Sequence, residues 1–473
     1  MKKNIFSIKK ITAFSVTAML AACQAVGPNY ERPQGELPAN YTEALSTQTQ
    51  AQLAIQDWWK LFEDATLNDL VAQALKNNTD VKYAVARIEE ADAYAREVGA
   101  ATLPSADFDA GASRSRVSET GANPVSNNPR ANYNYQLNSS FEIDFWGKIR
   151  RAKESARAQL LATKYAKETV AWTLSSNVAR NYLALRSVEA QLAISQNNLK
   201  SRDESLALTK RRFEGGVSSK LDVHQAEVAS ANLTADIADL TRQRAIYAHQ
   251  LATLTGKLDL NLASGNGTQL PAPPTPPAGL PSRLLENRPD VRQAEEQLVA
   301  MNANIGSAKA ALYPTISLTG VFGGESLELS DVLKSASRIW TAGLDISIPI
   351  FNSGRLSSRV EQATAKQKQA LAQYEASVRS AFQEVNDALV SVRQYTEREN
   401  ALNQSAEAAN NALKISENRY RDGYSSYLEV LDAQRVYNDA TRSAALAREA
   451  RLVASVDLFK ALGGGWETSS EPK

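Results

Sequence analysis

The chain has 473 residues, a formal net charge of +1 and a mean hydropathy of −0.36. Its 53 basic and 52 acidic residues are interleaved, so we expect no basic surface that binds nucleic acid. The mature part has no run of about 20 apolar residues, which excludes a bundle of apolar transmembrane helices, whereas membrane β-strands need only alternating hydrophobicity.

The residue types that serve metal and thiol chemistry are scarce. Cys23 is the sole cysteine, and the two histidines, His224 and His249, lie too far apart in sequence to form a local metal pair. No nucleophile motif and no phosphate-binding glycine loop occurs. We therefore expect no enzyme, no metal site and no cofactor, and a passive function whose energy comes from a partner.

The N-terminus carries a secretion pattern. Residues 1–22 have a basic start and then an apolar run, as signal peptides do. The segment Leu20-Ala-Ala-Cys23 resembles a bacterial lipobox, which predicts cleavage before Cys23 and acylation of its thiol. The alternative is an ordinary signal peptide with a chance cysteine. Gln24, in place of aspartate, is typical of lipoproteins sent to the outer membrane, where acyl chains bind by burial worth ~0.8 kcal/mol per methylene.

Two stretches show the alternation of β-strands. Apolar and polar side chains alternate strictly over residues 132–145 and again over 340–350. Weaker alternation over 106–116 and 316–322 supplies a hairpin partner for each. Each strand pair is followed by a long helical pattern, the first from about residue 148 to 213, which corresponds to a rod of roughly 100 Å. Apolar residues recur along both rods at intervals of seven, as in coiled coils.

Each rod ends in a similar bend. One copy reads RFEGGVSSKLDV from Arg212 and the other RYRDGYSSYLEV from Arg419. Gly216 and Gly423 stand where a helix C-terminus needs a left-handed residue. A capping-box spacing follows in both copies, Ser219-x-x-Asp222 and Ser426-x-x-Glu429, and it predicts that a new helix begins at once.

The whole pattern occurs twice, because Gly147, Gly216 and Gly256 recur as Gly354, Gly423 and Gly463, in each case 207 positions later. The predicted organisation is therefore a tandem repeat. Its segments are a signal peptide (1–22), a lipid-anchored extended arm leading into an equatorial region (23–66), repeat 1 (67–263, with a first helix at 67–101, strand pair 106–146 and tip bend 213–219), a Pro-rich linker (264–284), repeat 2 (285–463, with strand pair 315–351 and tip bend 420–426) and a C-terminal tail (464–473).

Four strands per chain resemble membrane-barrel strands, but four cannot close a barrel and an open edge is not tolerated in lipid. Oligomerisation must supply the rest, giving eight strands in a dimer or twelve in a trimer. The alternative is a soluble four-stranded sheet packed on a helix. That arrangement is disfavoured because both strand pairs open directly into rods too long to fold back over them.

Three short motifs add a family resemblance: Val26-Gly-Pro-Asn-Tyr30, Asn287-Arg-Pro-Asp-Val291 and Leu428-Glu-Val-Leu-Asp-Ala-Gln-Arg435. Together with the lipobox and the two-copy plan, they resemble the TolC-type outer-membrane efflux factors, in their lipoprotein (NodT or OprM-like) branch. The resemblance covers essentially the whole mature chain. It implies an α+β membrane protein: a homotrimer with a twelve-stranded β-barrel continued by a periplasmic α-helical barrel.

The resemblance also implies functional residues. Acidic groups just after the bends would form an aperture constriction, and Tyr420 would be a lock tyrosine. The family's best-studied member has a second lock residue, an arginine, where this chain has Ser425, which puts that lock in doubt, and Arg435 is the candidate substitute. The implied aperture gate is Asp432, Asp222, Glu429, Tyr420 and Arg435.

The acidic residues also have a local interpretation. Asp222 and Glu429 hold the acidic positions of the capping boxes, where the helix dipole favours a carboxylate in any case. Asp432 lies one turn deeper, and its counterpart in the first copy is Gln225. Repeated three times in a trimer, its carboxylate would form a ring that favours cations. We therefore expect the second copy to close the tip, if the tip closes.

The expected function is the outer-membrane exit duct of a tripartite system that conducts drugs or other small solutes. The partners are a periplasmic membrane-fusion adaptor and an inner-membrane pump, usually of the resistance-nodulation-division class, together with outer-membrane lipid. The adaptor-contact residues are Gly216, Val217, Ser218, Ser219, Gly423, Tyr424, Ser425 and Ser426, whereas the loop 117–131 lies at the opposite end. The alternatives are the same duct serving metal-ion export or type I protein secretion, and a lipid-anchored coiled-coil scaffold without a pore.

Overall fold

The computed structural model describes residues 25–33, 38, 41, 57–122, 128–262, 270–271, 274 and 288–463. The predicted signal peptide, Cys23, most of the linker and the C-terminal tail lie outside the described residues. The chain forms two compact units, each assembled from three separate segments. The first comprises Met1–Gln34, Arg87–Thr163 and Gln293–Tyr374, and the second comprises Gly35–Ala86, Lys164–Arg292 and Glu375–Lys473.

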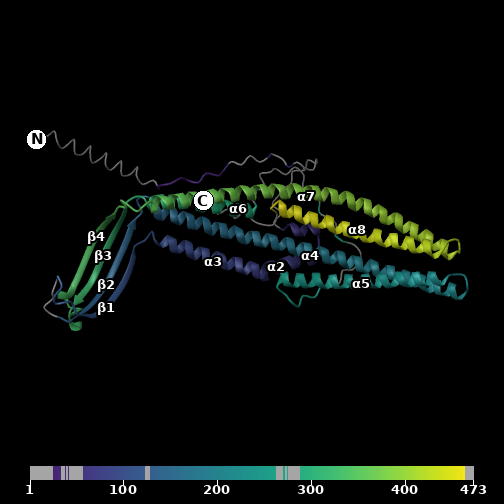
Figure 1. The fold of residues 1–473 in the computed structure, drawn as a ribbon, viewed down its shortest axis with the longest axis horizontal. Coiled ribbons are helices and arrows are strands. Elements are labelled where there is room, and N and C mark those ends of the chain that lie inside the picture. Colours follow the sequence, from purple (N-terminus) through teal and green to yellow (C-terminus); the bar gives the residue numbers. More distant parts are fainter. Residues whose placement is uncertain are drawn as a thin grey trace. The chain divides into compact units, whose positions relative to one another are not determined.

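The first unit contains one antiparallel sheet of four strands in the order β1-β2-β3-β4 (Figure 1). The strands are β1 (Ser105–Ser115), β2 (Arg130–Ile143), β3 (Thr315–Ser326) and β4 (Arg338–Ser347), with the short turns η3 (Leu329–Asp331) and η4 (Ser335–Ser337) between the last two. The central pair, β2 and β3, comes from different repeats and sets Leu137 opposite Phe322. The two predicted hairpins therefore join edge to edge.

The last predicted strand ends earlier than the alternation suggests. β4 stops at Ser347, so Ile348 and Ile350 lie outside it although they continue the apolar pattern. Pro349 explains the difference, because proline has no N–H to donate to a strand ladder. Periodicity alone did not show this limit.

The N-terminal arm is fixed along the first unit by specific contacts. Arg32 donates two hydrogen bonds to the Glu295 carboxylate, at 2.7 and 2.6 Å, and the Tyr30 hydroxyl donates a third at 3.3 Å. Gly27 lies against Gly306 so closely that a Cβ on Gly27 would approach the Gly306 Cα to 2.5 Å. The motif Val26-Gly-Pro-Asn-Tyr30 is therefore a packing motif on helix α6 (Pro289–Ala310).

The helix predicted over residues 67–101 is broken in two, as α2 (Ala65–Asn77) and α3 (Thr79–Ala100). Asn78 separates them with ψ at 138°, outside the helical range. Its side chain accepts a hydrogen bond from the Asp80 N–H at 2.8 Å and donates one to the Leu254 carbonyl at 3.0 Å. The asparagine thus caps the new helix and ties it to the end of α5 (Lys220–Thr255).

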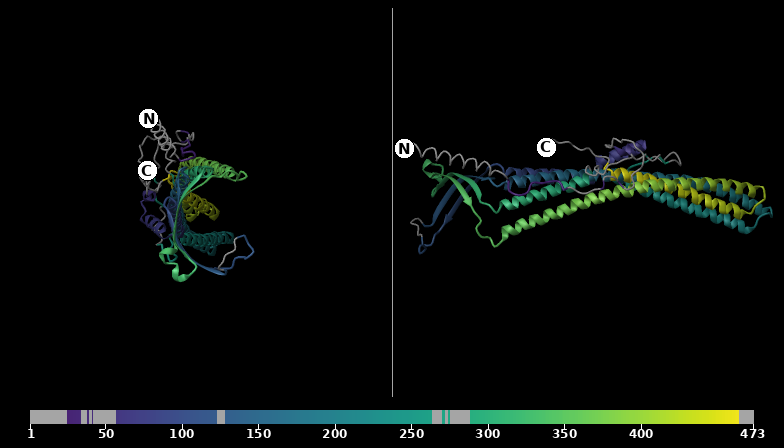
Figure 2. Two further views of the ribbon diagram at one scale, coloured as in Figure 1. Left: turned by 90° about the vertical axis from the view of Figure 1, so that its left-hand side faces the viewer. Right: turned by 90° about the horizontal axis from the view of Figure 1, so that it is seen from above.

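The long helices match their predicted extents closely. α4 (Lys148–Glu214) and α7 (Arg355–Arg421) each have 67 residues, and they are followed by α5 (Lys220–Thr255) and α8 (Tyr427–Ala461). Within the second unit, the α4–α5 and α7–α8 bends lie at the same end (Figures 1 and 2). In the part of the chain that the structure describes, no helix is both long enough and apolar enough to cross a membrane.

The main core of the second unit lies away from the bends. The short helix η1 (Trp58–Phe62) buries Trp58, Trp59 and Phe62, while Leu61 stays exposed. Trp58 stacks on Phe459 of α8 with ring centroids 6.1 Å apart. Aromatic side chains of this size dominate the energy of a core, so this cluster fixes α8 against the segment that directly precedes the first repeat.

Candidate functional site at the helical bends

Both bends are closed by the same backbone hydrogen bonds. The Val217 N–H donates to the Arg212 carbonyl at 2.9 Å, and the Tyr424 N–H donates to the Arg419 carbonyl at 2.8 Å. Gly216 and Gly423 have φ values of +76° and +86°, which side chains with a Cβ rarely adopt. These are Schellman caps, and the glycine positions predicted from the sequence are confirmed.

The first bend has the predicted capping box. The Asp222 N–H donates to the Ser219 hydroxyl at 3.2 Å, and the Ser219 N–H donates to the Asp222 carboxylate at 3.0 Å. The Ser218 hydroxyl donates to the same carboxylate at 2.8 Å. Burial alone would raise the pKa of Asp222, but the hydrogen bonds from Ser219 and Ser218 outweigh it and hold that pKa below its ordinary value.

The second bend lacks the capping box that its sequence suggests. Ser426 makes no side-chain capping hydrogen bond. The Glu429 carboxylate instead accepts a hydrogen bond from the Arg419 Nε at 2.9 Å. The capping-box prediction is therefore wrong for this copy, because a longer acidic side chain reaches back across the bend to an arginine. Equal spacing in the sequence gives two different arrangements.

Tyr420 lies at the centre of a contact between the two hairpins. Arg212 of α4 places its guanidinium 4.5 Å from the ring centroid and donates to the Tyr420 carbonyl at 2.7 Å. The hydroxyls of Thr209 and Tyr420 lie 3.2 Å apart. The Tyr427 ring lies 5.6 Å from the Tyr420 ring between centroids, and burial raises the pKa of Tyr427 to about 12. A buried tyrosine of the second hairpin is thus held by two residues of the first.

The deeper carboxylate has a different environment. Asp432 accepts a hydrogen bond from Arg435, one turn further along the same helix, at 2.9 Å, and both side chains are exposed. Ser425 buries its hydroxyl with no hydrogen-bond partner in the described part of the chain. Arg435 therefore pairs within its own helix in this chain and does not reach Ser425. Asp432 remains accessible to solvent.

The outermost residues of the bends are apolar and exposed. Val217 is 75% exposed and Tyr424 is 79% exposed. They occupy equivalent positions, 207 residues apart. Sequence reasoning missed Thr209, Arg212 and Arg419 as functional candidates. The arginines carried a usable signal, since they occupy equivalent positions in both copies, but nothing in the sequence marks Thr209.

Residues 70–257 and 280–464 match the sequence profile of the outer membrane efflux protein family. The chain belongs to this family. It is 33% identical over 464 residues to the solvent efflux pump outer membrane protein SrpC of Pseudomonas putida, covering 95% of this chain and 97% of that protein.

Solved structures agree. The outer-membrane channel OprN is 32% identical with a TM-score of 0.87, covering 93% of this chain and 99% of that one. The open-state MtrE channel of Neisseria gonorrhoeae is 29% identical with a TM-score of 0.85, covering 95% and 100%. The predicted TolC-type fold, with two tandem repeats, is confirmed. The predicted function as an outer-membrane efflux duct is confirmed as well. The family is one of channels and not a class of enzymes. Family membership also places the chain in the outer membrane, with a periplasmic extension.

Proposed function

We propose that this chain is a trimeric exit duct, anchored by acyl groups on Cys23 and closed at rest by its helical bends. Three copies of the four-stranded sheet would close a twelve-stranded barrel, and the helices of the two repeats, 67–263 and 285–463, would form the periplasmic tube. An adaptor and a pump of the resistance-nodulation-division class would deliver drugs or other small solutes to it. The contact of Tyr420 with Arg212 carries the proposal, because a passive duct needs a closure that a partner can open.

The acidic residues take separate roles in this proposal. Asp222 serves the first bend as a helix cap, since its carboxylate is already engaged by Ser218 and Ser219. Asp432 and Glu429 supply the charge of the aperture, because both are exposed and neither caps a helix. Tyr420 is the latch, held by Arg212. Arg435 moderates the charge of Asp432.

The decisive experiment for this function combines genetics and capture. A strain that lacks the gene should become more susceptible to several drugs or solvents, and the full-length chain should restore resistance. Affinity capture of that chain after crosslinking in the cell should recover one adaptor and one pump. Heat-modifiable trimers in outer-membrane fractions should accompany both results. A monomeric chain outside those fractions would support the coiled-coil scaffold instead.

The adaptor should contact the exposed residues of the bends. Cysteines introduced by Val217→Cys and Tyr424→Cys should crosslink to the adaptor, since both side chains project from the Schellman caps. A cysteine introduced by Ser118→Cys, in the loop between β1 and β2, is the matched control and should not crosslink. Crosslinking at position 118 alone would invert the orientation of the chain.

A further inference from the structure

A groove of about 670 Å³ lies in the second unit, away from the bends and from the candidate gate. α7 and α8 form its two sides, and Arg180 of α4 contributes to its lining. Part of its surface is apolar, from Leu446, Ala450 and Val453, and Tyr395 adds an aromatic ring. Ligand sites for drug-sized molecules occupy roughly 300–1,000 Å³.

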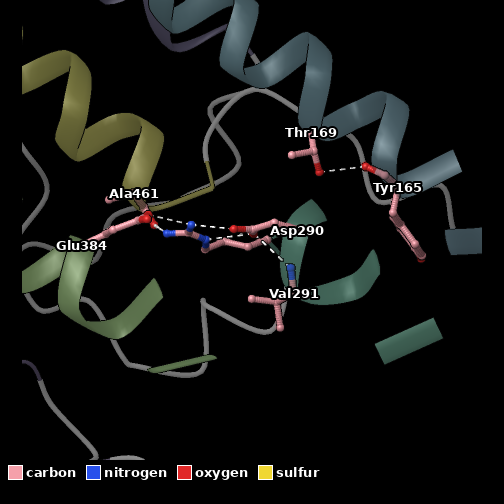
Figure 3. Close-up of polar contacts among 7 residues, drawn as sticks. Tyr165, Thr169, Asp290, Val291, Glu384 and Ala461 are labelled. Atoms are coloured by element: carbon pink, nitrogen blue, oxygen red, sulfur yellow. Dashed lines mark hydrogen bonds and ion pairs between the residues drawn. The ribbon is translucent and has the colours of Figure 1, made fainter. Parts of the chain in front are cut away.

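The groove carries more negative than positive charge. Its lining has four carboxylates (Glu384, Asp387, Glu449 and Asp457) and two cations (Arg180 and Lys460). Asp457 accepts a hydrogen bond from Arg180. Glu384 accepts a hydrogen bond at 2.7 Å from Arg288, which lies outside the groove lining. Figure 3 shows Glu384, Asp290 and the Ala461 carbonyl around the same guanidinium.

The two remaining carboxylates have only neutral hydrogen-bond donors among the described residues. Asp387 accepts from the Gln383 side chain at 3.2 Å. Glu449 is half-buried and accepts from the Ser187 hydroxyl, and its burial raises the carboxyl pKa despite that hydrogen bond. Lys460 of the same helix lies 5.4 Å from the Trp172 ring centroid, so its charge is directed to an aromatic face as well. A carboxylate that lies at the edge of an apolar surface and has no cationic partner favours a positively charged ligand.

The geometry points to a binding site for organic cations with an apolar body in this groove, with Glu449 and Asp387 as its anionic contacts. An anion would meet four carboxylates. A bare metal ion would gain nothing from the apolar lining, and two of the carboxylates are already ion-paired. An organic cation uses the whole surface: its apolar part covers Leu446 and Val453, its charge faces Glu449, and Tyr395 offers a cation–π contact. The site rests on the proposed efflux function, and it would bind organic cations transiently as they pass through the duct.

The test is direct binding of tetraphenylphosphonium to the purified full-length protein in lipid nanodiscs, with empty nanodiscs subtracted. We expect saturable binding that Glu449→Gln weakens roughly five-fold and Glu449→Gln combined with Asp387→Asn weakens further. Glu407→Gln, which removes one exposed charge from α7 outside the groove, should leave the affinity unchanged. Tetraphenylborate, of the same shape and opposite charge, should not bind there.

The site would be refuted by equal binding of both tetraphenyl ions, or by an affinity that Glu449→Gln leaves unchanged. The variant Val453→Cys tests whether a neighbouring copy of the chain covers the groove in the assembled protein. Its thiol should react with a cationic maleimide, and tetraphenylphosphonium should slow the reaction. A thiol that is unreactive in the assembled protein would also overturn the proposal. Because binding is measured without adaptor or pump, its failure leaves the efflux role intact, and failed complementation with intact binding would count against the efflux role alone.

Acidity provides a second signature of the same site. Because burial raises the Glu449 pKa, this carboxyl becomes neutral at a higher pH than an ordinary glutamate as the solution is acidified. Binding should weaken over that interval in the native chain, and Glu449→Gln should remove that part of the pH dependence. The other titratable groups of the groove are Glu384, Asp387 and Tyr395 from α7, Asp457 and Lys460 from α8 and Arg180 from α4. They are present in both proteins, so the comparison isolates Glu449.

Discussion

Arg288 shows how a single motif residue acts as a structural centre. Only 2% of it is exposed, yet it carries a full charge. Its guanidinium donates to Asp290 at 2.7 Å, to Glu384 at 2.7 Å and to the Ala461 carbonyl at 2.9 Å (Figure 3). It also lies 5.0 Å from the Trp172 ring centroid. The Arg-Pro-Asp motif therefore joins the start of α6 to α4, α7 and the end of α8.

Replacing Arg288 by lysine should destabilise the protein strongly. Lysine keeps the charge but cannot serve three acceptors from one planar group, which leaves the buried Ala461 carbonyl without its donor. A buried acceptor left without a hydrogen bond costs about 1–3 kcal/mol. Thermal unfolding of the detergent-solubilised protein should show a lower midpoint. Arg379→Lys, at an exposed pair with Glu375, is the control and should change little. An unchanged midpoint for Arg288→Lys would show that the network adds no stability.

Asp222 should behave as a cap and its effect should depend on pH. Its folded pKa lies below the ordinary carboxyl value, so its stabilising contribution is complete above that ordinary value and is lost as the pH falls through the lowered one. Asp222→Asn should therefore reduce the free energy of unfolding at neutral pH by about 1 kcal/mol. At strongly acidic pH the substitution should leave that free energy unchanged. Unfolding of both proteins across this range measures the difference. Conductance should be unaffected, and a changed conductance would return Asp222 to the gate.

At the scale of elements, the two hairpins share their turn and differ in how each uses its acidic residue. The Asp222 carboxylate of the α4–α5 bend completes a capping box, and the Glu429 carboxylate of the α7–α8 bend pairs with Arg419. The contact between the hairpins is also unequal, with Thr209 and Arg212 on one side and Tyr420 on the other. In the proposed mechanism, closure would be released at this unequal contact.

Removing Arg212 should loosen the latch. Arg212→Ala deletes both the cation–π contact and the hydrogen bond to the Tyr420 carbonyl, so single-channel conductance in planar bilayers should rise. Arg211→Ala is a matched control, because this neighbouring arginine of α4 is exposed. Equal effects of the two substitutions would attribute the change to lost positive charge and not to the latch.

The Asp432 carboxylate should control cation flow separately. Asp432→Ala should raise conductance and weaken block by divalent cations, because a ring of exposed carboxylates attracts and holds them. Gln225→Ala, at the equivalent position of the first copy, is the control and should leave the block unchanged. Unaltered conductance and block in Asp432→Ala would remove this residue from the gate.

At the scale of elements, only local structure could be predicted from the sequence. Glycine, serine and aspartate at fixed spacing determine a Schellman cap and a capping box, and these were foreseen in the first bend. The contacts of Tyr420 were not, because they depend on which hairpin packs against which, and Thr209 has no distinctive spacing. Asn78 was missed for another reason: apolar periodicity continues across it, while one side chain diverts the backbone hydrogen bonds.

At the scale of the whole molecule, the repeats are joined through the sheet. β2 belongs to the first repeat and β3 to the second, and their pairing runs from Tyr133 opposite Ser326 to Ile143 opposite Ile316. Alternation predicted each hairpin, but the pairing between hairpins is long-range and no local pattern records its register. At two of the β3 glycines, Gly323 and Gly324, an added Cβ would come within 3 Å of Tyr135 on β2.

Gly323→Val should prevent the repeats from forming one sheet. A Cβ at Gly323 would collide with the Tyr135 carbonyl, which is backbone and cannot move aside without loss of the β2–β3 register. Heat-modifiable trimers in outer-membrane fractions should therefore be lost, and resistance with them. Gly320→Val, three residues earlier on the same strand, is the matched control, because a Cβ there meets no atom within 4 Å. Since valine favours strands, the control should assemble normally. Failure of both variants would mean that neither glycine position tolerates a branched residue, and normal assembly of Gly323→Val would show that the β2 backbone can move aside at this point.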